Sequence, residues 1–406
     1  MTGSRVEARR GHKPDYILGL VVFGLLAIGL VMMYSISPIL SYKLTGSPTS
    51  NYYFNNHLLN VAIGIVAWIA AANIDYRSWK RWAPALVVVA AVTLVALLVP
   101  GLSTTKNGAT RWLALGPLSF QPSELLKLAM ILYLAVWFER RADQAKTFWD
   151  GLVPFGVMML GAGLAVVIFQ RNLSTMLVLG AAAVGMYFVA GIKWRHLAAM
   201  LATAVALAWV AIVTFPHRLA RLVTFLNPSQ NLSAAGYQLN QALIAIGSGG
   251  LFGLGLGKSI QVHGYLPEVA NDSIFAIIAE EFGLIGAALI LGLFVVLVLR
   301  GLRIAREAPD SFGRLVATGI TLWLFVQALI NLAAMMSLIP LTGIPLPFIS
   351  YGGSSLVISL VGAGILMNIS KYSTREVAHA PDRQRRGDGW SYLANSSRGR
   401  SLKAAR

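Results

Sequence analysis

The amino-acid sequence predicts an all-α polytopic membrane protein with ten transmembrane helices, and three observations predict it. Hydrophobic residues make up 56% of the 406 residues, whereas charged residues make up 12%, about half the share of roughly 25% found in ordinary globular chains. Ten apolar stretches approach the ~20 residues that cross a bilayer. Basic residues are divided unevenly between the loops on the two sides. A soluble globular fold is excluded, because so few charges could not cover its surface.

The ten predicted spans occupy a membrane domain over residues 16–371. They are approximately 16–37, 56–74, 82–100, 121–138, 152–169, 173–190, 197–215, 272–299, 315–337 and 348–370. The first span is too long for the apolar region of a signal peptide and lacks a small-residue cleavage site, so we expect a retained anchor. A basic tail, 1–15, precedes the spans. A second basic tail, 372–406, is poor in aliphatic residues and is expected to be disordered.

The orientation follows from the distribution of Lys and Arg. With the N-terminus in the cytoplasm and alternating spans, the cytoplasmic tails and loops hold 25 of the 33 Lys and Arg, the outer loops hold seven, and Lys127 lies within a span. Cationic residues collect in cytoplasmic loops, so we expect both termini in the cytoplasm. The same bias explains the net charge of +17 without nucleic acid as a partner, since a DNA-binding protein is not built from apolar spans.

A large, partly helical outer loop, 216–271, is predicted between spans 7 and 8. Its segments 217–226 and 237–246 place apolar residues at helical spacing, and the first has the pattern of an interfacial helix. The glycine-rich run 247–257 follows. Gly257, Lys258 and Ser259 match the end of a phosphate-binding P-loop, but Phe252 stands where that motif requires glycine. A loop that is half apolar and half polar suits a substrate with a lipid tail and a polar head.

Five carboxylates lie outside the predicted cytoplasmic segments: Glu124, Glu268, Asp272, Glu280 and Glu281. An ionisable group at the centre of a membrane helix costs roughly 2.5–3.5 kcal/mol or more. The i,i+3 spacing allows Glu124 to pair with Lys127, either to hold the bundle together or to order an outer cavity for a charged substrate. Asp272 opens span 8, where spacing alone favours a helix cap. Glu280 and Glu281 are adjacent, so at least one of them is expected to face the bundle interior.

Four cations make the outer side positive: Arg111, Arg218, Arg221 and Lys258. Cations beside a single base-like carboxylate suit chemistry on a phosphate-bearing substrate. Anchoring of Arg111 and Trp112 among lipid headgroups is an equal alternative. The chain has no cysteine, and its six histidines show no metal-ligand spacing, so no metal site is predicted from side chains alone.

Four blocks of the sequence resemble the signature of the SEDS proteins (shape, elongation, division, sporulation). They are NGATRW at 107–112 with QPSELLK at 121–127, GYQLNQ at 236–241 with IGSGG at 246–250, GYLPE at 264–268 with Asp272 and EEFG at 280–283, and GIPLPFISYGGSS at 343–355. With the spans, the resemblance covers about 16–372. The runs GLVMMYS at 29–35 and VPG at 99–101 are more similar to the division members of the family than to the elongation members.

The resemblance implies a peptidoglycan glycosyltransferase that polymerises lipid II, an undecaprenyl-pyrophosphate-linked disaccharide peptide, on the outer face of the bacterial cytoplasmic membrane. It also implies a class B penicillin-binding protein and other division or elongation proteins as partners. Asp272 would be the general base, Arg111 and Lys127 would help to hold the pyrophosphate or position the loops, and Glu124 would orient Lys127. The side chains of Gln121, Lys258 and Ser350 would complete the substrate-binding set. A divalent metal, Mg or Mn, between pyrophosphate and Asp272 is compatible with this chemistry, although no ligand cluster requires it.

One departure from the family pattern and two rival functions remain. Many members carry QPDLGT near span 6, where this chain has QRNLST at 170–175, so the role of that acid does not transfer to Asn172. A lipid II flippase is the first rival, but it should have ionisable groups near the midplane. A division scaffold without catalysis is the second. The distinctive groups cluster at the outer edge, which favours chemistry there.

Overall fold

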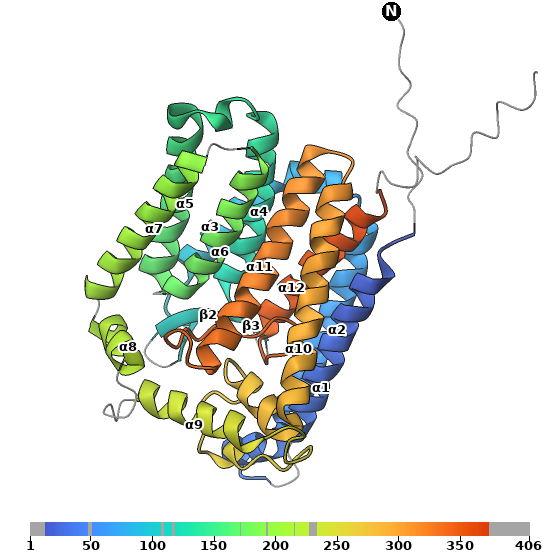
Figure 1. Ribbon diagram of the computed structural model, residues 1–406, viewed down its shortest axis with the longest axis vertical. Helices are drawn as coiled ribbons and strands as arrows, with labels where there is room; N and C mark the ends of the chain where they lie inside the picture. The colour runs from blue at the N-terminus through green and yellow to red at the C-terminus, as the bar shows by residue number, and fades with distance from the viewer. Residues whose placement is uncertain are drawn as a thin grey trace, which may run out of the picture.

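The structure is a computed structural model that describes residues 13–47, 51–106, 109–115, 118–170, 172–191, 194–214, 216–226 and 234–372. In these residues, ten long helices lie roughly side by side along the long axis of the molecule (Figure 1). They are α1 (Tyr16–Thr45), α2 (Tyr52–Asn73), α3 (Trp79–Ala96), α4 (Pro122–Arg140), α5 (Val153–Gln170), α6 (Leu173–Val189), α7 (Trp194–Thr214), α10 (Ile274–Glu307), α11 (Ser311–Met335) and α12 (Gly353–Ser370). Helix α11 is the most enclosed of the candidate spans, and its Trp323 is fully buried.

Each predicted span coincides with one of these helices. Seven are long and apolar enough to cross a membrane, namely α1, α2, α3, α5, α10, α11 and α12, and α6 is apolar but shorter. The chain is therefore a multi-pass membrane protein, while the count of ten crossings stays a prediction. Helix α10 continues eight residues beyond the predicted end at 299, because Arg, Leu, Ala and Glu favour helix, although the Arg and Glu residues lower the hydropathy. The predicted start at 348 is wrong, because α12 begins at Gly353 after a turn.

The outer loops form one end of the bundle, which we call the loop end. It contains the two helices predicted in the large loop, α8 (Pro216–Leu226) and α9 (Ala234–Ser248), and α9 lies across the bundle axis (Figure 1). It also contains a small antiparallel sheet that the sequence analysis missed, in the order β1 (Ser103–Lys106), β2 (Ala109–Leu115) and β3 (Leu118–Phe120). Threonine and tryptophan favour strands, but these strands are too short for a clear alternating pattern.

Helix α10 is broken at Gly283, where φ is 64° and ψ is −161°, a conformation almost restricted to glycine. The glycine-rich segment 249–257 satisfies the backbone groups that the break leaves open. Leu254 and Gly255 donate to the carbonyls of Glu280 and Glu281, and Leu284 and Ile285 donate to those of Gly250 and Leu251, over 2.9–3.3 Å. A Cβ at Gly253 would lie 2.1 Å from the Glu281 carbonyl oxygen. The glycines therefore permit this pairing within an apolar helix bundle.

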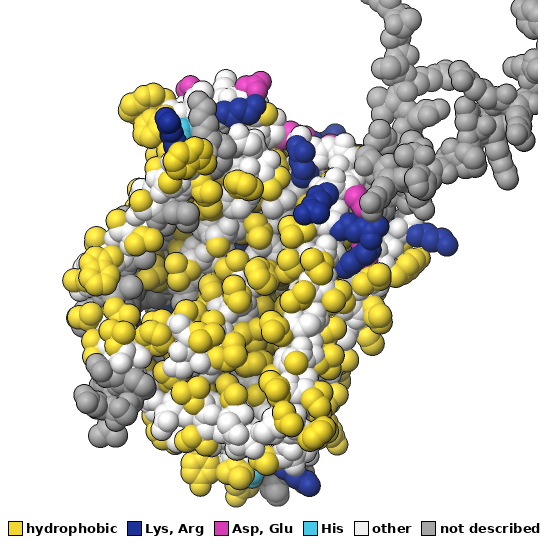
Figure 2. Space-filling view, viewed as in Figure 1, with side chains coloured by type: hydrophobic (Ala, Val, Ile, Leu, Met, Phe, Trp, Pro, Cys, Tyr) yellow, Lys and Arg dark blue, Asp and Glu magenta, His cyan; other side chains and the backbone are white. Residues whose placement is uncertain are grey.

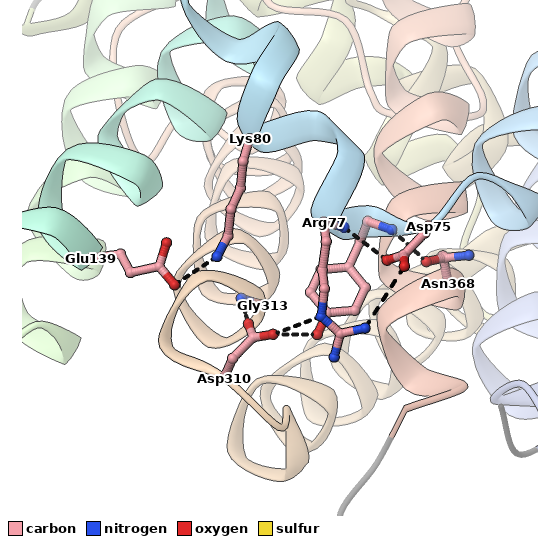
Figure 3. Close-up of polar contacts among 8 residues, drawn as sticks. Asp75, Arg77, Lys80, Glu139, Asp310, Gly313 and Asn368 are labelled. Carbon is pink, nitrogen blue, oxygen red and sulfur yellow. Dashed lines mark hydrogen bonds and ion pairs between the residues drawn. The ribbon is translucent and has the colours of Figure 1, made fainter. Parts of the chain in front are cut away.

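The opposite end, which we call the terminal end, carries the first and last described residues and a network of paired charges. Asp310 accepts hydrogen bonds from the Tyr76 hydroxyl at 2.6 Å and the Arg77 Nε at 3.3 Å (Figure 3). Lys80 pairs with Glu139 at 2.7 Å, and Arg300 pairs with Asp15 at the start of α1. Lys and Arg side chains gather at this end in Figure 2, whereas hydrophobic side chains cover the flank. This distribution agrees with the predicted cytoplasmic position of this end.

Candidate active site

Asp272 lies in the turn before α10, at the loop end. The residue is 8% exposed, and its Oδ1 atom has no hydrogen-bond partner among the described residues. The N-cap of α10 is Ser273, which makes no side-chain capping bond. The capping role that spacing favoured for Asp272 is therefore wrong. A buried carboxylate oxygen without a partner is costly, and such an arrangement is typical of functional sites.

Burial raises the pKa of the Asp272 carboxyl from 3.8 to about 7, and the negative charge of Glu268 acts in the same direction. A hydrogen bond from Gln238 of α9 and the positive charge of Arg221 of α8 oppose this rise. A carboxyl with a pKa near neutrality suits a general base, because about half of it is ionised at neutral pH and the ionised form accepts a proton readily.

The segment 338–352 surrounds Asp272 and ties it to the other helices. A Cβ added to Gly343 would lie 3.8 Å from Asp272 Oδ2, so this segment faces the carboxylate. The following hydrogen bonds hold the segment: Asn331 to the Ile344 carbonyl, Gln327 to the Pro345 carbonyl, Arg221 to the Leu341 carbonyl, Ser174 to the Thr342 carbonyl, and the Tyr351 N–H to the Ala270 carbonyl. Helices α6, α8 and α11 thus fix the backbone around Asp272.

The predicted pairing of Glu124 with Lys127 is confirmed. Their side chains are each 3% exposed, and Lys127 Nζ lies 2.8 Å from Glu124 Oε2. The same ammonium donates to Gln327 Oε1 at 2.7 Å and lies 5.1 Å from the centroid of the Trp323 ring. Lys127 is therefore enclosed by partners from its own helix and from α11. This geometry favours the bundle-holding alternative and does not present the ammonium directly to a substrate.

Arg111 lies on the middle strand β2, beside the end of α5. Its Nε donates to the Gln170 carbonyl at 3.1 Å, and Gln170 Nε2 donates back to the Arg111 carbonyl at 3.3 Å. The Oε1 atom of Gln170 is buried without a partner among the described residues. Asn172, which stands where many family members carry an acid, caps α6, because its side chain accepts a hydrogen bond from the Thr175 N–H at 3.2 Å. A cap needs only an acceptor oxygen, so asparagine serves here without a charge.

The three other predicted binding residues lie in different surroundings. Gln121 precedes α4, and its backbone N–H donates to Ser354 Oγ at 3.0 Å. Ser350 is buried, and its Oγ accepts from the Leu346 N–H at 2.8 Å, so it stabilises the turn that faces Asp272. Lys258 is exposed in the glycine-rich segment. No hydrogen bond or ion pair within the described ranges joins it to the other predicted site residues.

Sequence reasoning missed two amides on α11, Gln327 and Asn331, which are 0% and 1% exposed. Gln327 contacts Lys127, and Asn331 donates to the Asp272 carbonyl at 2.8 Å. The signal was present, because polar residues four apart share one face of a helix and hydrogen-bond to neighbouring elements within a membrane. Amides carry no charge, so a count of the ionisable residues in the sequence does not include these two side chains.

The described residues do not form a protein-only cage for a divalent metal. They contain no group of three or more His, Cys, Asp or Glu side chains placed to hold an ion. Magnesium is commonly held by one or two carboxylates together with substrate phosphates, so Asp272 would hold such an ion only together with a bound pyrophosphate.

The chain is similar to known proteins over nearly its whole length. The family model "Cell cycle protein" (FTSW_RODA_SPOVE) matches residues 16–375. Stage V sporulation protein E of Bacillus subtilis is 40% identical over 361 residues, which are 89% of this chain and 98% of that protein. A probable peptidoglycan glycosyltransferase FtsW of a Geobacter species is 38% identical over 362 residues, again 89% and 98% of the two chains.

Solved structures show the same fold. A chain of a peptidoglycan synthase complex that coordinates polymerization and crosslinking superposes with a TM-score of 0.72, at 26% identity over 88% of this chain and 98% of that one. The rod shape-determining protein RodA of Thermus thermophilus gives a TM-score of 0.63, at 28% identity over 89% and 98%. These matches agree with the motifs at 107–127, 236–283 and 343–355. The chain belongs to the FtsW/RodA/SpoVE family of SEDS cell cycle proteins.

Proposed function

We propose that the chain is a peptidoglycan glycosyltransferase that polymerises lipid II into glycan strands. Relatives that match 85–90% of its length carry the name peptidoglycan glycosyltransferase. The observation that carries the proposal is the buried Asp272 carboxylate, with a pKa raised to about 7 and one oxygen without a partner in the described structure. A non-catalytic scaffold needs no such group, because a buried carboxylate oxygen without a partner lowers the stability of the fold.

Asp272 acts as the general base in the proposed reaction. Its carboxylate removes the proton from a sugar hydroxyl of the acceptor as that oxygen attacks the anomeric carbon of the donor. The bond from this carbon to the pyrophosphate oxygen breaks, and the lipid pyrophosphate leaves with the bonding electrons. The proton remains on the Asp272 carboxyl until it passes to solvent. General base catalysis of this kind contributes about 10²–10⁴-fold to the rate.

The cationic side chains have different roles in the proposed reaction. Arg111 on β2 and Arg221 on α8 both lie at the loop end, and their positive charge stabilises the leaving pyrophosphate. Lys127 acts from within the bundle, where Glu124 and Gln327 hold it, so its charge supports the site through the field and the position of α4. The residues Gln121 and Ser350 shape the walls of the site, and Lys258 interacts with a more distant part of the substrate.

The proposed location is the bacterial cytoplasmic membrane, with the loop end outside and both termini in the cytoplasm. The excess of Lys and Arg at the terminal end supports this orientation. The likeness to a chain of a peptidoglycan synthase complex supports a class B penicillin-binding protein as partner, beside other division or elongation proteins. The predicted domains are a basic tail at 1–15, a membrane domain at 16–371 and a second basic tail at 372–406, and the described helices lie within the membrane domain. Most of both tails lies outside the described residues.

The test is polymerisation of fluorescent lipid II by the purified full-length chain with its penicillin-binding protein, read as glycan chains on a gel. We expect chains from the wild type and none from Asp272→Asn. Asp143→Asn is the matched control, because it makes the same change on a side chain that is 98% exposed at the terminal end. Equal chains from all three proteins would refute the role of Asp272. Movement of lipid II across vesicles without any polymer would favour the flippase.

A further inference from the structure

The amide pair on α11 connects the two charged centres of the loop end. Gln327 and Asn331 are four residues apart, so their side chains lie on one face of α11, one turn from each other. Gln327 Oε1 accepts from Lys127 Nζ at 2.7 Å and from the Trp323 indole at 2.9 Å. Asn331 Nδ2 donates to the Asp272 carbonyl at 2.8 Å. One rigid helix therefore contacts both the buried ion pair and the backbone of the proposed base.

The same two amides also hold the segment that faces Asp272. Gln327 Nε2 donates to the Pro345 carbonyl at 3.0 Å, and Asn331 Nδ2 donates to the Ile344 carbonyl at 2.7 Å. These carbonyls follow Gly343, the residue that lies against the Asp272 carboxylate. A single Asn331 amide nitrogen thus fixes the turn of Asp272 and the opposing segment relative to each other. Such a bridge sets how far the two walls of the site are apart.

We propose that Asn331 and Gln327 are positioning residues for the polymerisation, which act by holding Asp272 and segment 343–345 at the distance that the acceptor hydroxyl needs. The inference rests on the proposed function. Its physical basis is that both amides are buried and bonded to the backbone of segment 343–345, and that Asn331 also bonds the Asp272 carbonyl, beside the bond from the Tyr351 N–H to the Ala270 carbonyl. Displacement of a catalytic group by about 1 Å costs up to roughly 10²-fold in rate.

The Oδ1 atom of Asn331 adds a reason to place this residue at the site. It is buried without a partner among the described residues, as is the Oδ1 atom of Asp272. The amide that bonds the Asp272 backbone carbonyl therefore also carries an open acceptor oxygen. The buried atoms without partners in Trp68, Trp79 and His196, residues toward the terminal end in the described ranges, are ring nitrogens and not oxygens.

The experiment compares steady-state polymerisation by the full-length chain with its penicillin-binding protein for Asn331→Leu, Gln327→Met and the double variant. We expect kcat to fall about 10- to 100-fold in each single variant, with KM for lipid II within about twofold. The double variant should lose less than the product of the two single losses, because both residues position one unit. Thr321→Val is the matched control, since Thr321 is buried on the same helix and, among the described residues, its hydroxyl donates to the Ala317 carbonyl of that helix.

The possible outcomes separate the inference from the proposed function. A kcat unchanged in Asn331→Leu, or a KM raised at constant kcat, would overturn the positioning role. If Asn331→Leu loses no more kcat than Thr321→Val, and the two variants change the melting temperature equally, the loss reflects stability alone. That result would also overturn the positioning role. Asp272→Asn is measured in parallel. If that variant keeps the wild-type rate, the assignment of the base fails, whatever Asn331→Leu does.

Discussion

The loop end and the terminal end of the bundle differ in whether their buried polar side chains have hydrogen-bond partners. At the terminal end, Asp310 satisfies its oxygens with Tyr76, Arg77 and the Gly313 N–H. At the loop end, oxygens of Asp272, Asn331, Gln170 and Thr342 are buried without partners in the described structure. A paired charge stabilises the fold, whereas an unpaired buried oxygen lowers stability. Because Glu124 and Lys127 are paired at the loop end as well, the two ends differ in the unpartnered oxygens of the loop end, which indicate a binding site there.

The largest expected effect comes from Asp272→Asn. Activity should fall about 10²–10⁴-fold, because the general base is lost. The raised pKa means that the folded state holds the proton more tightly than the unfolded state, so this carboxyl destabilises the fold as pH rises from about 4 to about 7. We therefore expect Asp272→Asn to melt at a higher temperature than wild type at pH 8, and at the same temperature near pH 4.

Thermal unfolding in detergent at the two pH values is the measurement. A variant that is less stable than wild type at pH 8 would contradict the view that Asp272 is a strained, functional group.

The buried pair of Glu124 and Lys127 gives the next effect. Lys127→Met or Glu124→Gln alone should lower the free energy of unfolding by about 3–5 kcal/mol, because each leaves an uncompensated buried charge. The double variant should recover most of this loss, since both charges are gone. Chemical unfolding of the three variants measures the coupling. Two single losses that simply add in the double variant would show that the pair contributes nothing as a pair.

A smaller effect is expected from pH on the polymerisation rate. A base with a pKa of about 7 is mostly protonated at pH 6 and mostly ionised at pH 8, so kcat/KM should rise roughly tenfold over this range. The profile of the wild type, measured with saturating partner protein, tests this. An acid limb near pH 4 would show that the carboxyl is solvated in the working enzyme and that the loop end opens before catalysis.

The smallest effect should come from the terminal end. Asp310→Asn weakens the bonds with Tyr76 and Arg77 and the cap on α11, which together should cost about 1–2 kcal/mol, because the side chain is 28% exposed. The polymerisation kcat should stay within about twofold of wild type. Melting temperature and the gel assay provide the two measurements. A large loss of kcat with little loss of stability would show that the two ends are coupled.

Much of the fold was predictable because it depends on local physics. The ten helices follow from apolar length, α8 and α9 follow from helical periodicity, and the pairing of Glu124 with Lys127 follows from their spacing. The small sheet at 103–120 was missed because its strands are too short for periodicity. Asp272 was identified as the candidate base only through the family resemblance, since spacing by itself favoured a cap.

The sequence by itself determined the class of the protein, its helices and its family, because hydropathy, charge distribution and motif order are properties of the chain. Only the tertiary structure decided which polar groups meet. It placed Gly343 against Asp272, enclosed Lys127 with Gln327, and brought the glycine-rich segment to the break in α10. These contacts join residues from 26 to 200 positions apart, and their geometry depends on how whole helices pack, which no local pattern records.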